Sequence, residues 1–191
     1  MCIRDSNNRI NVELEAMAKT LYDYWFVQFD FPISAEYAAS VGQPELEGKP
    51  YKSSGGKMVW SDELKREVPE GWELKELSEI AEIKAGGDRP KVYSSFRSEQ
   101  FKIPIFSNGI TNEGFYGYTD KAKIFKQSIT VTGRGANVGY SVLRNTPFLP
   151  IIRLLVITPN FPFYSKFLFE SIQNINFLNY LKKTLIFYKK I

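Results

Sequence analysis

The sequence contains no histidine and a single cysteine, Cys2. One cysteine cannot form a disulfide within the chain, and without histidine no Cys/His zinc site can be assembled. The same absence excludes the Ser-His-Asp and Cys-His forms of nucleophilic catalysis. Several common kinds of catalytic and metal site are therefore excluded before any motif is considered.

Long apolar runs are also missing, since no stretch reaches the roughly 18 consecutive apolar residues that a membrane-spanning helix requires. The start of the chain lacks the basic and then apolar order of a signal peptide. We therefore expect no membrane partner and a cytoplasmic location. With 191 residues, 43% apolar and 24% charged, the composition is typical of a globular protein with one domain and an appendage.

The two signs of charge are separated along the chain. Residues 1–83 carry 9 Lys and Arg against 16 Asp and Glu, net −7, whereas residues 84–153 carry 11 against 4, net +7. Residues 154–191 carry 5 against 1, net +4. A basic region beside an acidic one favours a polyanion-binding domain, although basic stretches also occur as solvated surface. The four carboxylates of residues 84–153 are scattered among cations, which disfavours a metal nuclease.

Residues 7–28 predict a helix, because apolar side chains recur at steps of four and three without Gly or Pro between them. The heptad seam comprises Ile10, Leu14, Met17, Leu21 and Tyr24. Two heptads also fit an amphipathic helix that packs on its own domain. Residues 1–6 fit neither this pattern nor a targeting signal, and we expect them to be an artefact outside the fold.

The rest of the chain divides into a connector and a domain. Residues 29–68 are rich in Gly, Pro and Ser and have the composition of a long connector. The domain is expected over residues 69–191, opening with a turn and a short helix. Alternating and β-branched segments separated by turn residues predict strands. The expected strands are residues 101–106, 115–118, 128–131, 138–143 and 151–157.

An apolar and aromatic stretch at residues 163–180 predicts a closing helix. The tail at residues 181–191 carries no helix stop signal, and we expect the domain to be truncated there. The predicted fold class is therefore mixed α/β, a β-rich domain preceded by an N-terminal heptad helix of the coiled-coil type.

Three segments resemble parts of one known family, the DNA-specificity subunits of type I restriction-modification systems. Residues 8–26 (NRINVELEAMAKTLYDYWF) resemble the end of the conserved spacer helix of that family. Residues 48–60 (GKPYKSSGGKMVW) and the motif Val68-Pro69-Glu70-Gly71-Trp72-Glu73 look like the lead into a target-recognition domain. The resemblance spans roughly residues 8–160, and residues 161–191 depart from the family pattern.

A specificity subunit of this family has two target-recognition domains, held apart by antiparallel helices, and each domain reads one half of a split DNA site. The resemblance implies that this chain is the central helix followed by the second domain, with no catalysis of its own. It implies double-stranded DNA and the methyltransferase (M) and restriction (R) subunits as partners. S-adenosylmethionine, ATP and Mg are then expected on the partner subunits, and no cofactor in this chain.

DNA recognition requires cations and amides for phosphates and planar side chains for base edges. The loop of residues 84–91 combines glycines with three cations, and suits either a phosphate backbone or a solvated turn. Residues 130–140 place three glycines around Arg134 and Asn137, residue types that pair with guanine and adenine. This stretch also resembles the glycine-rich β-loop of the family's recognition domains, and a tight turn between strands is the alternative.

A second loop offers amide and hydroxyl groups between glycines. The candidate DNA-binding residues are Lys84, Arg89, Lys91, Asn108, Thr111, Asn112, Lys123, Arg134, Asn137 and Tyr140.

Two other functions fit parts of the sequence. A DNA adenine methyltransferase needs a glycine-rich cofactor loop and an Asp/Asn-Pro-Pro-Tyr/Phe motif, for which Gly133-Arg134-Gly135 and Asn145-Thr146-Pro147-Phe148 are near misses. These elements lie only about ten residues apart, which leaves no room for the intervening βα units. A coiled-coil adaptor that binds protein instead of DNA is the other alternative, and salt-sensitive duplex binding separates it from a DNA reader.

Overall fold

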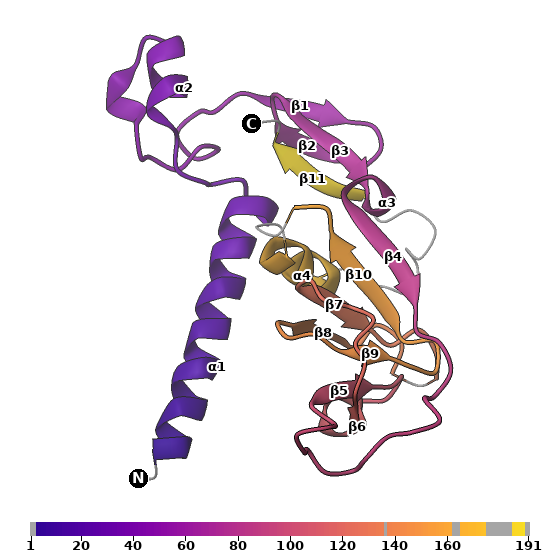
Figure 1. The fold of residues 1–191 in the computed structure, drawn as a ribbon. Coiled ribbons are helices and arrows are strands. Elements are labelled where there is room, and N and C mark those ends of the chain that lie inside the picture. Colours follow the sequence, from indigo (N-terminus) through magenta and orange to yellow (C-terminus); the bar gives the residue numbers. More distant parts are fainter. Residues whose placement is uncertain (1–2, 136, 162–164, 175–184, 190–191) are drawn as a thin grey trace. The chain divides into compact units, whose positions relative to one another are not determined.

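The computed structural model describes residues 3–135, 137–161, 165–174 and 185–189 (Figure 1). The chain divides into two compact units, unit 1 with residues 1–74 and 187–191, and unit 2 with residues 75–186. Helices and strands occur together, which confirms the mixed α/β class. In the described ranges no helix has both the length and the apolar character needed to cross a membrane.

Unit 1 opens with helix α1 (Ile3–Tyr22), which continues into the π-helical turn η1 (Asp23–Val27). The helix begins at Ile3, so residues 3–6, which we expected to lie outside the fold, are helical. No residue of α1 is buried. Four seam side chains, those of Ile10, Leu14, Met17 and Leu21, are between 48% and 60% exposed, and Tyr24 in the π-helical turn is half-buried.

Residues 29–68, expected to be a connector, form a structured module instead. It contains α2 (Ala35–Ser40), the 3-10 turn η2 (Pro44–Leu46), and an antiparallel hairpin of β1 (Met58–Ser61) and β2 (Arg66–Pro69). Ser34 begins α2, because its hydroxyl accepts a hydrogen bond from the backbone N–H of Tyr37 at 3.2 Å. The Gly, Pro and Ser residues lie in turns, as the composition of the segment indicates. Aromatic side chains nevertheless give the segment a core.

That core is a stack of three rings, which we call the aromatic sandwich: Tyr51, Phe31 and Trp72. The Phe31 ring lies 4.8 Å from Tyr51 at 18° and 5.2 Å from Trp72 at 25°. A Cβ atom on Gly56 would lie 2.4 Å from the Tyr51 ring, so only glycine fits there. The sandwich therefore joins the two segments that resemble the lead into a recognition domain, residues 48–60 and 68–73.

Two further contacts hold the same module together. Phe29 is fully buried at a φ of 63°, and the Arg66 guanidinium lies 4.7 Å from its ring centre. The carboxylate of Asp30 accepts hydrogen bonds from the N–H and hydroxyl of Ser53, at 2.7 and 2.6 Å. Strand β3 (Trp72–Glu76) leads out of the module and pairs with β11 (Leu185–Lys189).

Unit 2 contains two sheets. An antiparallel sheet has the order β4 (Ala81–Ala85), β10 (Leu155–Pro159), β7 (Ser128–Val131) and β8 (Ser141–Arg144). The other has the order β6 (Phe115–Thr119), β5 (Ile103–Phe106) and β9 (Leu149–Pro150), in which only the β5–β9 pair is parallel.

These strands largely match the predicted segments, but the strand predicted at residues 138–143 begins only at Ser141, and β4 and β9 were not predicted. The predicted strand at residues 151–157 begins only at Leu155, because Ile152 and Arg153 adopt positive φ angles of 51° and 56° and form a turn after β9. The predicted short helix behind Trp72 is reduced to α3 (Leu77–Ile80), because Leu74 belongs to β3.

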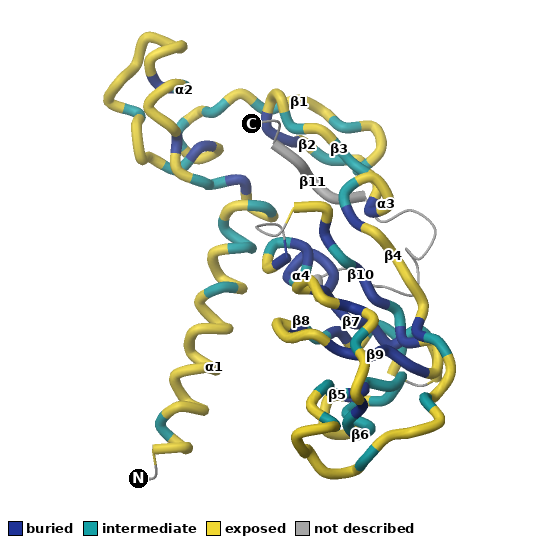
Figure 2. The backbone as a smooth tube through the Cα atoms, in the orientation of Figure 1, coloured by how far each residue is buried: buried dark blue, intermediate teal, exposed yellow. Residues whose placement is uncertain are grey.

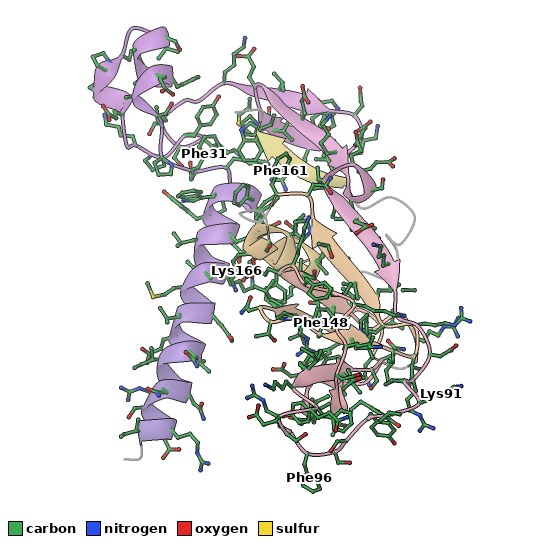
Figure 3. All side chains as sticks on the ribbon, in the orientation of Figure 1. Phe31, Lys91, Phe96, Phe148, Phe161 and Lys166 are labelled. Carbon is green, nitrogen blue, oxygen red and sulfur yellow. The ribbon has the colours of Figure 1, made fainter. Side chains whose placement is uncertain are left out.

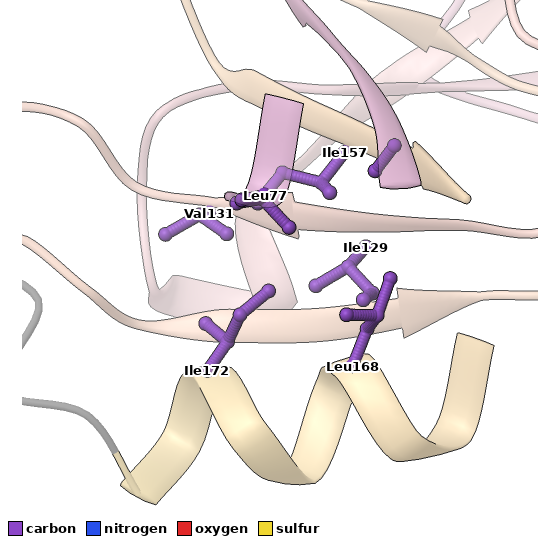
Figure 4. Packing of buried hydrophobic residues seen from close by; sticks show 7 residues of the cluster. Leu77, Ile129, Val131, Ile157, Leu168 and Ile172 are labelled. Atoms are coloured by element: carbon purple, nitrogen blue, oxygen red, sulfur yellow. The ribbon is translucent and has the colours of Figure 1, made fainter. Parts of the chain in front are cut away.

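Helix α4 (Ser165–Asn174) covers the four-stranded sheet, and Leu168 and Ile172 point from it toward Ile129 of β7 (Figure 4). These three side chains are 0–2% exposed, and each contributes about 1.5–3 kcal/mol by burial. Figure 2 shows the buried residues concentrated in β7, β10 and α4. The helix predicted over residues 163–180 is thus found at 165–174, and residues 175–184 lie outside the described ones.

Candidate nucleic-acid interface

The two polar loops predicted to face DNA are joined by one side chain. Asn108 Oδ1 accepts a hydrogen bond from the backbone N–H of Gly133 at 2.9 Å, and Asn108 Nδ2 donates to the carbonyl oxygen of Arg134 at 3.4 Å. Asn108 follows β5, whereas Gly133 and Arg134 follow β7 in the other sheet. The amide therefore holds the backbone beside Arg134, a use that the sequence did not reveal.

The glycine-rich loop (residues 132–140) connects β7 and β8 through backbone hydrogen bonds. The N–H of Thr132 donates to the carbonyl of Tyr140, and Gly139 donates back to Thr132, both at 2.9 Å. The hydroxyl of Thr132 donates to the carbonyl of Asn137. Gly135 and Gly139 have φ angles of 86° and 96°, which explains why glycine stands at these positions.

Inside this frame the side chains of Arg134 and Asn137 are exposed. Across the part of the chain that the structure describes, Arg134 forms no ion pair. Tyr140 at the end of the loop is 40% exposed. The loop thus presents a guanidinium, an amide and a phenol outward, the groups able to contact base edges and phosphates.

The second loop, residues 107–114, is closed at its base. The N–H of Ser107 donates to the carbonyl of Gly114 at 2.7 Å, and the Ser107 hydroxyl donates to the same oxygen at 3.2 Å. Gly114 has a φ of 77°, and a Cβ atom there would lie 2.5 Å from the Ser107 carbonyl oxygen. The 3-10 turn η3 (Thr111–Gly114) fills this loop and leaves Thr111 and Asn112 exposed.

Arg144, at the end of β8, anchors this turn and was missed from the sequence. Its side chain is 7% exposed, its Nη1 donates to the Glu113 carboxylate at 2.8 Å, and its Nη2 donates to the Glu113 carbonyl at 2.5 Å. The guanidinium also lies 3.6 Å from the Phe106 ring centre. Burial lowers the pKa of Arg144, which Glu113 counteracts. An arginine directly after a predicted strand was the available signal, but no local pattern pointed to Glu113 as its partner.

A basic group forms where the loop of residues 84–91 meets the segment before β7. Lys123 Nζ lies 3.3 Å from the place where a Cβ atom would stand on Gly87. The N–H of Gly87 donates to Pro150, and that of Lys123 donates to Phe148, so the β9 region holds both segments. Lys84 differs, because it pairs with Glu82 at 2.7 Å on β4.

Arg89 contacts two tyrosines, Tyr93 and Tyr116. Arg89 Nη1 donates to the Tyr116 hydroxyl at 2.9 Å, and its guanidinium lies 5.6 Å from the Tyr93 ring centre. Hydrogen bonds from Tyr93 and then Arg89 lower the pKa of Tyr116 below its ordinary value. The predicted phosphate cation Arg89 therefore also ties its loop to β6, while Lys91 is exposed.

The structure thus brings the predicted residues together in two groups and leaves Lys84 outside both. One group comprises Asn108, Thr111, Asn112, Arg134, Asn137 and Tyr140. The other comprises Lys123 with the loop that carries Arg89 and Lys91. Among the described residues no three carboxylate or thiol groups gather where they could hold a metal ion.

A pocket of about 490 Å³ opens beside β5 and β6. Its lining includes the aromatic rings of Phe106, Phe115 and Tyr118 and the cations Arg97 and Lys102. No sequence pattern indicated it, because its lining comes from residues 97–118 and from the turn at Thr146 and Pro147.

Comparisons with known proteins give matches to proteins that carry the name of type I specificity subunits. Two Mycoplasma pneumoniae proteins whose names identify them as type I specificity subunits are 34% identical over 102 residues and 32% identical over 109 residues. The matches cover 53% and 56% of this chain, and the chain spans about 30% of the length of each relative.

The fold is shared with a solved structure, the S subunit of a type I restriction-modification system from M. genitalium. The TM-score is 0.59 at 13% sequence identity, covering 97% of this chain and 45% of the other. Residues 69–190 match the family described as Type I restriction modification DNA specificity domain, so the expectation that the family pattern is lost after residue 160 is wrong. Because that match covers more than half of the chain, the protein belongs to the family of type I restriction-modification DNA specificity domains, as the sequence resemblance indicated.

Proposed function

We propose that this chain recognises a specific sequence in double-stranded DNA, one half of a bipartite site, and has no catalytic activity of its own. The observation that carries the proposal is the link from Asn108 to Gly133 and Arg134, which fixes two exposed polar loops beside each other in the basic part of the chain. A loop whose backbone is held before DNA binds presents its side chains from defined positions, which favours discrimination between bases.

The two kinds of group on this surface have different tasks. Arg134 and Asn137 match the acceptor and donor edges of guanine and adenine in the major groove. Lys91 and Lys123 are exposed cations, which suit phosphate oxygens and would set the register of the domain on the duplex. Sequence preference therefore arises in the glycine-rich loop, while affinity and its salt dependence arise mainly from the basic group.

The proposed partners follow from the family and from helix α1. The chain would direct methyltransferase and restriction subunits to its half-site, with S-adenosylmethionine, ATP and Mg bound by those subunits. The exposed seam of Ile10, Leu14, Met17 and Leu21 supports a partner surface on α1. If so, the wild-type chain self-associates in isolation, and Leu14→Asp shifts it toward a monomer in analytical ultracentrifugation. A wild-type monomer that does not respond to Leu14→Asp contradicts this role.

The test of DNA reading is a selection. The full chain, purified with the methyltransferase subunit of the same locus, is incubated with short duplexes of randomised sequence, and the bound fraction is sequenced. We expect one short motif to be enriched, and its binding constant to fall linearly with salt on a double-logarithmic plot. Binding without any enriched motif, or binding that salt does not change, would favour the protein-binding adaptor instead.

A further inference from the structure

Phe96 is the most exposed large apolar side chain in the described part of the protein, at 82%. Figure 3 shows it at the outer end of the long loop that also carries Lys91. A single exposed apolar residue is ordinary on a protein surface. Whether this one has a function depends on how its backbone is held and on what surrounds it.

The backbone beside Phe96 is fixed to strand β6. Ser94 and Tyr118 exchange two backbone hydrogen bonds, at 2.9 and 2.8 Å. The approach is close, since a Cβ atom on Gly117 would lie 2.7 Å from the Ser94 carbonyl oxygen. The N–H of Phe96 then donates to the Ser94 hydroxyl at 3.1 Å. Phe96 is therefore held in a set position with its ring in water.

The loop is also fixed on both sides of that position. Before it, Arg89 donates to Tyr116 at 2.9 Å. After it, Ser98 and Phe101 close a turn through the Ser98 N–H to the Phe101 carbonyl and the Phe101 N–H to the Ser98 hydroxyl, both at 3.1 Å. These contacts lower the entropy lost when the loop binds a partner.

The surroundings of Phe96 are positive. Lys91 and Arg97 are exposed, and within the described residues neither forms an ion pair. Lys102 pairs with Glu99 at 2.8 Å, where Glu99 is almost fully exposed. A protruding ring on a loop that also carries unpaired cations is complementary to a polyanion that contains stacked aromatic rings, which is the chemistry of a nucleic acid duplex.

The geometry points to Phe96 as an apolar wedge that inserts between two stacked base pairs and kinks the DNA, while Lys91 and Arg97 contact the phosphates on either side. The inference rests on the proposed function and adds a second mode of reading to it. Insertion separates base steps at a cost that depends on the step, so the wedge selects for deformable sequences without hydrogen bonds to bases.

The test uses the full chain with its methyltransferase subunit and the duplex obtained by selection. The duplex carries 2-aminopurine at each adenine position in turn, which reports unstacking, and a fluorophore pair at its ends, which reports the bend. Phe96→Ala is expected to weaken binding about 5- to 100-fold with an unchanged salt slope. It should also reduce the bend and abolish the fluorescence increase at one step. Phe96→Trp should preserve both signals. Arg97→Ala should lower the salt slope by about one unit.

The matched control is Trp60→Ala, which removes a 60% exposed aromatic ring in the acidic part of the chain and should behave as wild type. Neither variant removes a buried side chain, so folding is not in question. If the Phe96→Ala complex has the affinity, the DNA bend and the 2-aminopurine fluorescence of the wild-type complex, the wedge is refuted. The selected motif would then still support DNA reading. If the wild-type complex selects no motif and bends no duplex, the wedge and the proposed function fail together.

Discussion

The module of residues 29–68, with Trp72 packed on it, and the two loops of the candidate interface are held in opposite ways. In the module, side chains hold side chains: Phe31 lies between the rings of Tyr51 and Trp72. In the loops, the backbone is held by Asn108 and by main-chain hydrogen bonds, and the side chains of Arg134 and Asn137 are exposed.

This difference predicts where the protein tolerates substitution. A packed ring cannot change volume without leaving a cavity or a clash. A loop fixed through its backbone can change its outward side chains with little effect on its shape. Stability should therefore depend on the module, and recognition on the loops, so that variants of each region affect one property and spare the other.

The largest effect is expected in the aromatic sandwich. Tyr51 is 4% exposed, and Tyr51→Ala should lower the free energy of unfolding of unit 1 by about 3–5 kcal/mol, measured by urea denaturation with tryptophan fluorescence. Tyr51→Phe keeps the ring and loses the hydroxyl's hydrogen bonds to the Lys57 carbonyl and to the Tyr37 side chain, at a cost of about 0.5–1.5 kcal/mol for each bond. Equal losses for the two variants would show that stacking does not hold the module.

A smaller loss of stability is expected at Arg144. Its replacement by Ala removes bonds to Glu113 and the contact with Phe106, and should lower the unfolding free energy of unit 2 by about 2–3 kcal/mol. The loss stays below that of a fully buried ion pair because Glu113 is 59% exposed and can regain water.

Arg144→Lys is the matched variant, since it keeps the charge but lacks the planar fork that reaches both the carboxylate and the backbone carbonyl of Glu113. Hydrogen exchange of the turn at residues 111–114 should increase in both variants. An unchanged exchange rate at residues 111–114 would mean that the turn is stable without Arg144.

Variants of the candidate interface should lower the free energy of DNA binding by a comparable amount and leave the free energy of unfolding unchanged. Arg134→Ala and Asn137→Ala should each weaken binding to the selected motif by about 1–3 kcal/mol and relax preference at one position. Lys123→Ala should weaken all sequences alike and lower the salt slope by about one unit. Titrations of single-base variants at several salt concentrations measure both effects. If neither Arg134→Ala nor Asn137→Ala changes base preference, the glycine-rich loop is structural.

The smallest effect is expected at Asn108. Its side chain hydrogen-bonds to the backbone of the glycine-rich loop, so it combines a side-chain contact with backbone support. Asn108→Ala should cost about 0.5–1.5 kcal/mol of local stability and raise hydrogen exchange at Gly133 about tenfold or less. Asn108→Asp retains an acceptor for the Gly133 N–H and should exchange more slowly than Asn108→Ala. Were Asn108 itself a base reader, both substitutions would change base preference while exchange at Gly133 stayed constant.

Local patterns were sufficient for much of the fold. The strands at residues 103–106, 115–119 and 128–131 lie where the alternation and turn residues predicted them. The helix near the N-terminus was predicted by its heptad spacing, though its start at Ile3 was not. The module of residues 29–68 was missed because its turns are local signals, whereas the stacking of Phe31 between Tyr51 and Trp72 joins residues far apart in the chain.

The sequence by itself determined the separation of acidic and basic regions and the approximate positions of β5, β6, β7, β8 and β10, because each is a property of composition or of short spacing. It also carried the resemblance to the family, and it supplied the residues that we propose to contact DNA. Tertiary structure alone decided what holds those residues. Asn108 reaches Gly133 across 25 positions and Arg144 reaches Glu113 across 31. Such pairings depend on which strands become neighbours in a sheet, and that choice is made by packing of the whole domain rather than by any local run of residues.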